Sequence, residues 1–320
     1  MHAIARRFRL VQVLILLSFC FLNPSVGFAQ APLEPLKLIQ VAPNVFYVQG
    51  LAELGSSQNQ NFISNAGFVV TPQGVVVIDA LGSPMLAQRL ITSIRAITSK
   101  PIIALVLTHY HADHIYGAQA FKALGATIYA QAAGKNYLNS DAAIQRLQSS
   151  RIDFAPWVNA ETKLMPADIW IQGDLKLDLG GYPVQLLHAG PAHSPEDLMV
   201  YLPISGVLFS GDILFQGRIP FVGNADSKGW LHSLERIESL KPKMIVPGHG
   251  SFSNQPEKAV VFTRDYLRYL RETMGPAARN LESFDEAYRA TNWSEYEGYP
   301  LFKAANRMNA YNTYLLIQSE

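Results

Sequence analysis

The segment Thr108-His-Tyr-His-Ala-Asp-His114 follows an apolar run that begins at Ile102 and is typical of a buried strand. His109 and His111 are two residues apart, so an extended chain carries both imidazoles on the same side. Asp113 and His114 come where the chain is expected to turn into a helix, and they can face a second point near the first. Three histidines and an aspartate this close together, in a chain with only eight histidines, indicate metal binding rather than a solvated polar loop.

Three further positions with metal-binding side chains follow later apolar runs. Each residue alone could be an ordinary loop or turn residue. Because binding sites form where strands end along one rim of a sheet, four such positions in one chain predict a shared site. The three positions are His193 in Gly190-Pro-Ala-His193-Ser-Pro, Asp212 in Phe209-Ser-Gly-Asp212, and His249 in Val246-Pro-Gly-His249-Gly250.

Five histidines and two aspartates can supply two metal sites with three or four nitrogen and oxygen ligands each. Without thiolates, such a set suits Zn²⁺, with iron or manganese as alternatives. Thr108, Asp79 and His188 are candidates for orienting the imidazoles, although Asp79 fits equally well as a turn residue at a strand end. Tyr110 and Tyr116 flank the candidate ligands and are expected to pack rather than to react.

Composition limits the class of protein. The chain has 320 residues, of which 49% are hydrophobic and 16% are charged, and this supports a folded core rather than a disordered chain. A net charge of +1 without a basic stripe argues against nucleic acid as a partner. The single cysteine, Cys20, excludes a disulfide framework and a multi-thiolate metal cage.

Residues 1–31 have the pattern of a secretory signal peptide. Arg6, Arg7 and Arg9 come before the apolar run from Leu10 to Leu22, and Ala29-Gln30-Ala31 is a candidate cleavage site. An uncleaved membrane anchor is the alternative, but the run is short for a span of roughly 20 residues. We therefore expect a periplasmic or secreted protein with no membrane span after cleavage.

The rest of the chain twice runs through strand patterns and then helical patterns. This order predicts an α/β fold in which two sheets pack face to face with helices outside. The expected divisions are the signal peptide at 1–31, a catalytic domain at 32–252 and a C-terminal helical extension at 253–320 that packs on it. Strands are expected at 45–48, 61–70, 75–79, 102–108, 127–130, 169–171, 175–179, 184–188, 198–202, 207–210 and 244–246, and helices at 83–99, 114–124, 132–147, 228–240 and from 256 onward.

Together, the four motifs resemble those of the metallo-β-lactamase superfamily. His109-Tyr-His111-Ala-Asp113-His114 is similar to its H-x-H-x-D-H signature, and the later motifs follow in the same order. The resemblance covers residues 41–252 and implies the four-layer αβ/βα sandwich, here with extra C-terminal helices. It also implies one metal ion bound by His109, His111 and His193, a second bound by Asp113, His114 and His249, and a bridge between them at Asp212.

Some details resemble particular branches of that superfamily. Lactamases that use a thiolate place cysteine at the position of Asp212, whereas an aspartate there is similar to the glyoxalase II-type branch. Ala192 and Glu196 stand where the family often has glycine. Segments between Gly211 and Trp230 resemble exported metallohydrolases associated with quinoprotein and sulfur-oxidation systems.

The resemblance implies an exported dinuclear-zinc hydrolase that acts on a small-molecule substrate. A metal-bridging hydroxide would cleave an ester, thioester or amide/lactam bond, with Asp113 and Asp212 as the catalytic carboxylates. The alternatives are a β-lactamase, a mononuclear-iron persulfide dioxygenase and a non-catalytic metal-binding accessory protein. Arg218 is a candidate for contact with an anionic substrate, and the oligomeric state stays open.

Overall fold

The computed structural model, which describes residues 33–223 and 225–320, contains two β-sheets. The signal peptide expected at 1–31, with its cleavage site and Cys20, lies outside the described residues. Among the helices of the described ranges, none combines the length and the apolar character needed to span a bilayer.

The first sheet has seven strands that lie side by side in chain order. Strands β1 to β4 pair antiparallel, and β4 to β7 pair parallel. Parallel neighbours need crossover connections, and helices supply them here. The strands are β1 (Ile39–Ala42), β2 (Val45–Val48), β3 (Ala66–Val70), β4 (Val75–Ile78), β5 (Ile102–Val106), β6 (Thr127–Gln131) and β7 (Ile169–Ile171).

The second sheet has five strands in the order β12-β11-β10-β9-β8. Its strands pair antiparallel except for β11 and β12, which are parallel. A crossover that contains helix α6 (Ser227–Leu240) joins that parallel pair. The strands are β8 (Leu175–Asp178), β9 (Pro183–His188), β10 (Leu198–Leu202), β11 (Val207–Phe209) and β12 (Met244–Val246).

Alternating side chains let each sheet pack on both of its faces. On β2, Val45 and Tyr47 belong to the buried cluster between the two sheets, together with Val200 of β10. Phe46 and Val48, one position along, belong to the cluster between the first sheet and its helices. This double burial explains why the central strands are apolar at nearly every position.

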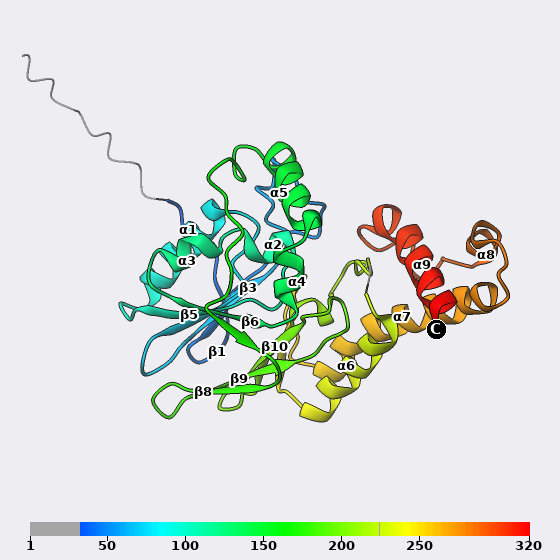
Figure 1. Ribbon diagram of the computed structural model, residues 1–320. Coiled ribbons are helices and arrows are strands. Elements are labelled where there is room, and N and C mark those ends of the chain that lie inside the picture. The colour runs from blue at the N-terminus through cyan, green and yellow to red at the C-terminus, as the bar shows by residue number, and fades with distance from the viewer. Residues whose placement is uncertain (1–32, 224) are drawn as a thin grey trace, which may run out of the picture. The chain divides into compact units, whose positions relative to one another are not determined.

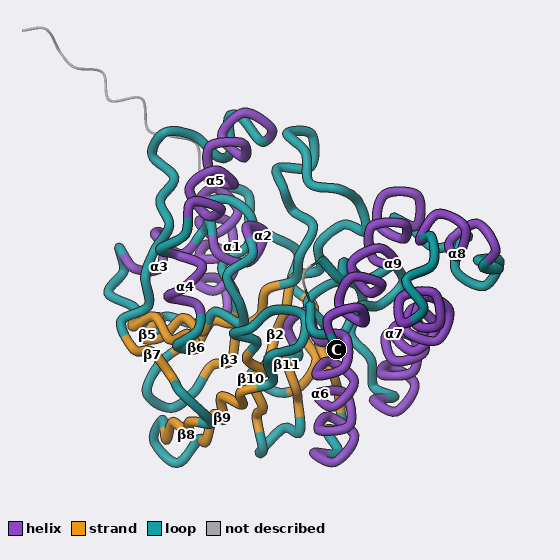
Figure 2. Tube along the Cα trace, turned by 45° about the vertical axis from the view of Figure 1, so that its right-hand side comes forward, coloured by secondary structure: helices purple, strands orange, loops and turns teal. Residues whose placement is uncertain are grey.

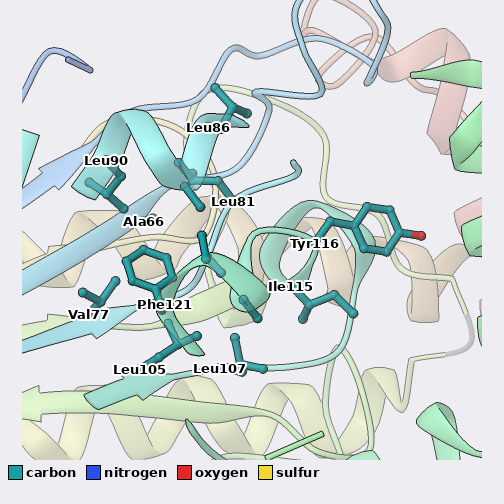
Figure 3. Close-up of a cluster of buried hydrophobic side chains, with 14 of the residues drawn as sticks. Ala66, Val77, Leu81, Leu86, Leu90, Leu105, Leu107, Ile115, Tyr116 and Phe121 are labelled. Carbon is teal, nitrogen blue, oxygen red and sulfur yellow. The ribbon is translucent and has the colours of Figure 1, made fainter. Parts of the chain in front are cut away.

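Helices cover the outer faces of the sheets (Figure 1), with α1 to α5 on one side of the strands and α6 to α9 on the other (Figure 2). Figure 3 shows how Val77 and Leu105 of the first sheet meet Leu90 of α1 and Phe121 of α3. The predicted α/β sandwich of four layers with extra C-terminal helices is confirmed. The helices are α1 (Pro84–Ile97), α2 (Ala112–Ile115), α3 (Ala118–Lys122), α4 (Gly134–Leu138), α5 (Asp141–Asp153), the 3₁₀ turn η1 (Gly211–Ile213), α6 (Ser227–Leu240), α7 (Pro256–Arg279), α8 (Phe284–Ala290) and α9 (Phe302–Ser319).

Two helices expected from the sequence are interrupted. The helix expected at 114–124 forms α2 and α3, which separate at Gly117, where a Cβ atom would lie 2.0 Å from the carbonyl oxygen of Ala80. The helix expected at 132–147 forms α4 and α5. Ser140 starts α5 because its side chain accepts a hydrogen bond from the Ala143 N–H.

The strand expected from residue 61 begins only at Ala66, and β1 was not expected. Gln60 and Asn61 have φ values of 60° and 57°, which a strand cannot accommodate. The loop that results brings Ser64 to α2, where its hydroxyl donates to the carbonyl oxygen of Asp113 at 2.5 Å. The other expected strands and the helices at 83–99 and 228–240 agree with the structure to within two residues at each end.

Candidate metal centre

The four sequence motifs meet where strands of both sheets end. Each motif lies in the first turn or loop after its strand, and the strand holds its backbone in place. The structure therefore brings together all seven residues that the sequence singled out. The segment after β5 carries His109, His111, Asp113 and His114, the β9–β10 loop carries His193, and the ends of β11 and β12 carry Asp212 and His249.

His109, His111, His193 and Asp212 form a first group, whose potential ligand atoms lie within 4.8 Å of one another. His111 Nδ1 lies 3.0 Å from His109 Nε2 and 2.9 Å from His193 Nε2. Asp212 Oδ2 lies 3.8 Å from His109 Nε2 and 3.4 Å from His193 Nε2. Three imidazole lone pairs and a carboxylate oxygen thus converge on one point.

Asp113, His114 and His249 form a second group. Asp113 Oδ2 lies 3.5 Å from His114 Nε2 and 3.3 Å from His249 Nε2. Asp212 reaches this group as well, because its Oδ1 lies 3.2 Å from His114 Nε2 and its Oδ2 lies 3.3 Å from His249 Nε2. The Asp212 carboxylate is therefore shared by both groups.

These separations fit a metal ion at each group. Two ligand atoms bound tetrahedrally at ~2.0–2.1 Å from zinc are ~3.3 Å apart, which lies within the distances seen here. His114 Nε2 and Asp212 Oδ1 are buried, and neither makes a hydrogen bond to a described residue. Buried polar atoms are rarely left without a partner, and a cation between these two would satisfy both.

Hydrogen bonds on the far side fix the tautomers of His109 and His114. His114 Nδ1 donates to Asp79 Oδ2 at 2.8 Å, and Thr108 Oγ1 donates to the same oxygen at 2.9 Å. Thr108 Oγ1 in turn lies 3.1 Å from His109 Nδ1 and can accept its hydrogen. With hydrogen on Nδ1, both rings direct Nε2 towards the site. Asp79 both orients the candidate ligands His109 and His114 and turns the chain, since its φ is 61°.

Asn65 holds the loop that carries His249, and no feature of the sequence pointed to it. Its Nδ2 donates to the carbonyl oxygens of Pro247 and Gly250, at 2.8 Å in both cases. Its Oδ1 accepts a hydrogen bond from the Gly50 N–H at 3.0 Å. The first two partners are 182 and 185 residues away in the chain, so no local pattern could have found this residue.

Aromatic rings form the inner wall of the site. The Phe215 ring stacks on His249, with centroids 5.0 Å apart and planes at 6°. The Trp230 ring lies 5.2 Å from that of His193. His249 Nδ1 donates to the carbonyl oxygen of Ile63 at 2.7 Å, so that its Nε2 faces the centre.

Of the other predicted residues, Tyr110 and Tyr116 are fully buried and pack as expected. Glu196 is also buried, and its carboxylate accepts a hydrogen bond from the Tyr110 N–H at 3.2 Å. His188 makes no side-chain hydrogen bond within the described part of the chain, and its Nε2 is buried without a partner. It therefore does not orient the candidate ligands.

Burial and neighbouring charges divide the imidazoles into two kinds. Burial lowers the pKa of His109 well below the usual value, and it lowers the pKa of His193 to about 3. Loss of solvent around its ring also lowers the pKa of His111, although the residue as a whole is exposed. These three rings are neutral at pH 7 and ready to bind a metal.

His114 is different because it lies among carboxylates. Burial lowers its pKa, but Asp212, Asp113 and Asp79 outweigh burial and raise the pKa well above the usual value. For Asp212, burial raises the pKa, but the charges of His249 and His114 outweigh it and hold the pKa well below the usual range. His114 therefore carries a proton that a metal ion must displace.

The site opens to solvent on the side of His111 and Asp113. His111 is exposed, and the Asp113 side chain is 17% exposed, whereas those of His109 and His114 are fully buried. An incoming molecule therefore meets these two residues first.

The C-terminal helices hold the loop behind the site. Val222 N–H donates to Asn309 Oδ1 at 2.9 Å, and Asn309 Nδ2 donates to the carbonyl oxygen of Pro220 at 2.7 Å. Ile219 N–H donates to the carbonyl oxygen of Pro300 at 3.0 Å. The expected division into a catalytic domain and an extension at residue 252 stays a prediction, but α9 is in direct contact with the loop that follows Asp212.

Comparisons with known proteins agree with this geometry. Residues 60–249, more than half of the chain, match the family described as the Metallo-beta-lactamase superfamily. The chain is 26% identical over 240 residues to a linear primary-alkylsulfatase of Pseudomonas sp. (strain ATCC 19151), a match that covers 64% of this chain and 45% of the relative. It therefore spans less than half the length of that sulfatase.

Two further relatives cover more of the chain. A metallo-beta-lactamase type 2 of Bacteroides fragilis is 23% identical over 274 residues, which cover 82% of this chain and 99% of the relative. Among solved structures, a double mutant of the sec-alkyl sulfatase PisA1 superposes with a TM-score of 0.67 at 18% identity, over 87% of this chain and 50% of that one. The latter similarity establishes the fold alone.

Proposed function

Because the chain belongs to the metallo-beta-lactamase superfamily, whose relatives found here include hydrolases, we propose that it is an exported hydrolase with two metal ions that cleaves an ester, thioester or amide/lactam bond in a small molecule. The observation that carries the proposal is the Asp212 carboxylate, which lies within 3.8 Å of imidazole nitrogens from both ligand groups. The nitrogen and oxygen ligand set supports zinc.

His109, His111 and His193 would hold one ion, Asp113, His114 and His249 the other, and Asp212 both. When bound, two such cations supply Lewis acidity and a water whose pKa lies near neutrality. The protein's own side chains orient the water and the candidate ligands. Asp113 lies at the open side of the site and is ionised, because the charges of His114 and His249 outweigh burial and lower its pKa. Its carboxylate can therefore accept a hydrogen bond from water and orient that water towards the substrate.

Asp79, Thr108 and the Ile63 carbonyl hold hydrogen on the outer nitrogens of three histidines. This arrangement directs the inner nitrogens towards the site, where a metal ion can bind them in place of any proton. The aromatic wall of Phe215 and Trp230 excludes water from the inner side of the site. Because Phe215 and Trp230 close the inner side, we expect the substrate to react at the open side of the site.

Hydrolysis of a sulfate ester is a second candidate, because one relative is an alkylsulfatase. The match covers 45% of that relative, so its activity comes to this chain only as a hypothesis. A β-lactam substrate is supported by the Bacteroides fragilis relative, while Asp212 in place of a cysteine argues mildly against it.

Elemental analysis of the purified protein, combined with a substrate panel, tests the proposal. We expect two zinc ions per chain and turnover of at least one thioester, aryl ester, lactam or alkyl sulfate. Iron with oxygen uptake on a persulfide would instead indicate a dioxygenase, and bound metal without turnover would indicate an accessory protein. Detection of the protein in the periplasm, with an N-terminus near residue 32, tests export.

Asp212→Ala should lower the metal content from two ions per chain towards one and abolish turnover, because it removes the ligand that both groups share. Asp265→Ala is the matched control, since it removes a carboxylate that is 45% exposed on α7. Two ions per chain in Asp212→Ala would contradict the shared role.

A further inference from the structure

Glu196 is a buried acidic residue in the loop between β9 and β10, which also carries His193. Only 5% of its surface is exposed. Its Oε1 accepts a hydrogen bond from the Tyr110 N–H at 3.2 Å, and Tyr110 lies between the candidate ligands His109 and His111. Among the described residues, this N–H has no other acceptor. The Glu196 carboxylate is therefore bound to the segment that supplies two ligands of the first group.

The loop that carries Glu196 is fixed by further hydrogen bonds. The Leu198 N–H donates to the carbonyl oxygen of Thr108 at 2.8 Å, so a second contact joins this loop to the segment after β5. Within the loop, the Asp197 carboxylate accepts hydrogen bonds from the Ser194 N–H at 2.7 Å and from Ser194 Oγ at 2.8 Å. The Glu196 side chain therefore extends from a well-held backbone, and its position relative to the first group is defined.

No side-chain cation pairs with Glu196 in residues 33–223 and 225–320. The ion pairs of lysine and arginine in this part of the chain all involve other carboxylates. Within the same residues, the Tyr110 N–H is the one hydrogen-bond donor to the Glu196 carboxylate. Burying a carboxylate without a paired charge is costly. A cation that binds nearby would lower this cost.

The charge of Glu196 acts on His111. Loss of solvent lowers the pKa of the His111 ring, whereas the charges of Asp113, Asp212 and Glu196 raise it. A carboxylate that favours positive charge on an imidazole also favours a metal cation bound to that imidazole, because both effects are electrostatic.

The two ligand groups differ in the negative charge that they offer to a cation. The second group contains Asp113 and is reached by Asp212, and its His114 donates to a third carboxylate, Asp79. The first group contains three imidazoles and the shared Asp212 alone. A divalent cation in the first group therefore meets less negative charge, and the Glu196 carboxylate reduces this difference.

We infer that Glu196 is a positioning residue for the first ligand group: its carboxylate holds the Tyr110 backbone and supplies negative charge that strengthens metal binding by this group. The inference rests on the metal-binding part of the proposed function and adds to it a residue outside the seven candidate ligands. Glycine, which similar proteins often have at this position, would supply neither the acceptor nor the charge.

The test separates the charge of Glu196 from its hydrogen bond. Glu196→Gln keeps the side-chain length and an oxygen that accepts the Tyr110 N–H, but it removes the charge. Glu196→Ala removes both. Competition with a chromogenic chelator at pH 7 measures the affinity of each zinc ion, and thermal unfolding of the metal-free protein measures stability. Glu235→Gln removes the same charge from an exposed position on α6 and is the matched control.

We expect Glu196→Gln to weaken the binding of one zinc ion by roughly 10-fold and to leave the other unchanged, and Glu196→Ala to weaken the same ion by up to ~100-fold. The unfolding midpoint of metal-free Glu196→Gln should not fall, because the variant removes an unpaired buried charge and keeps the hydrogen bond. Glu235→Gln should bind zinc as the wild type does.

Two further backgrounds identify the affected ion. His111→Ala removes a ligand of the first group, and His249→Ala removes a ligand of the second. Addition of Glu196→Gln should weaken the remaining zinc ion in the His249→Ala background, where the first group is intact. It should have no such effect in the His111→Ala background, because interacting residues give non-additive effects.

Equal zinc affinity in the wild type and Glu196→Gln would overturn the inference, and so would equal weakening in both backgrounds. A lower unfolding midpoint of the metal-free variant, together with weaker binding of both ions, would also overturn it, because Glu196 would then support only the fold. If the wild type binds two zinc ions but cleaves no substrate, the proposed hydrolase activity fails while the affinities still decide the role of Glu196. A wild type that binds no zinc would overturn both.

Discussion

Replacing Asp79 with asparagine tests how the ligands are oriented. The Asp79 carboxylate accepts three hydrogen bonds, from the Thr108 N–H at 2.8 Å, from Thr108 Oγ1 at 2.9 Å and from His114 Nδ1 at 2.8 Å. Asparagine has one oxygen and one NH₂ group, so it cannot accept all three. If the oxygen stays with the Thr108 N–H, the NH₂ group faces His114 Nδ1, and two donors meet.

His114 can relieve this conflict only by moving its hydrogen to Nε2, the atom that faces the metal site. Thr108 then turns its hydroxyl hydrogen towards His109 Nδ1, and that ring is driven to the same tautomer. Loss of such an outer hydrogen bond costs ~10- to 100-fold in metal affinity, or ~1.4–2.7 kcal/mol. Backbone strain does not confuse the result, because asparagine tolerates the φ of 61° at this position.

Competition with a chromogenic chelator at pH 7 measures the affinity of each zinc ion. Asp79→Asn should bind at least one zinc ion ~10- to 100-fold more weakly than the wild type. Asp168→Asn is the control, because it also removes a carboxylate that accepts a backbone N–H and pairs with a cation, Lys122. Zinc affinity that is the same in Asp79→Asn and the wild type would refute the reasoning.

Three further predictions concern the site and its support. Zinc binding at pH 7 should release protons, because the raised pKa of His114 leaves it protonated without metal. Zinc affinity should therefore rise with pH until that pKa is passed. Calorimetry in buffers of different ionisation enthalpy measures the proton release, and binding without any proton release would contradict the assignment. Gly248→Ala should lower zinc content, since its Cβ would lie 2.0 Å from Asp212 Oδ1; full occupancy by elemental analysis would argue otherwise. Asn309→Ala should lower the free energy of unfolding by ~1–3 kcal/mol in urea, because the Val222 N–H loses its acceptor, and an unchanged midpoint would count against this.

The sequence predicted the site best where a potential ligand residue follows the end of an apolar strand. Apolar runs predicted strands such as 169–171, 198–202 and 244–246 at the bounds that the structure shows. The side chains that follow such runs must lie at a sheet edge, so their convergence could be predicted from the chain alone. Their roles as metal ligands and catalytic groups stay predictions.

Tertiary contacts account for what the sequence did not reveal. Gly117 interrupts a helical pattern because the chain passes close to Ala80, which no periodicity records. Asn65 looks like any polar residue before a strand, although it holds the His249 loop from far away in the chain. Arg218 was noticed for its charge, but only its burial, with an Nε that has no acceptor among the described residues, distinguishes it from a surface arginine.

The spread of the candidate ligands along the chain has a consequence for biosynthesis. His109, His111, Asp113 and His114 leave the ribosome well before His249, which follows the last strand of the second sheet. A metal ion captured by the nascent chain would therefore meet an incomplete set of ligands. In small zinc modules, metal binding drives folding. This protein must instead complete most of its fold before the candidate site can retain a metal ion, so we expect metal binding to follow folding.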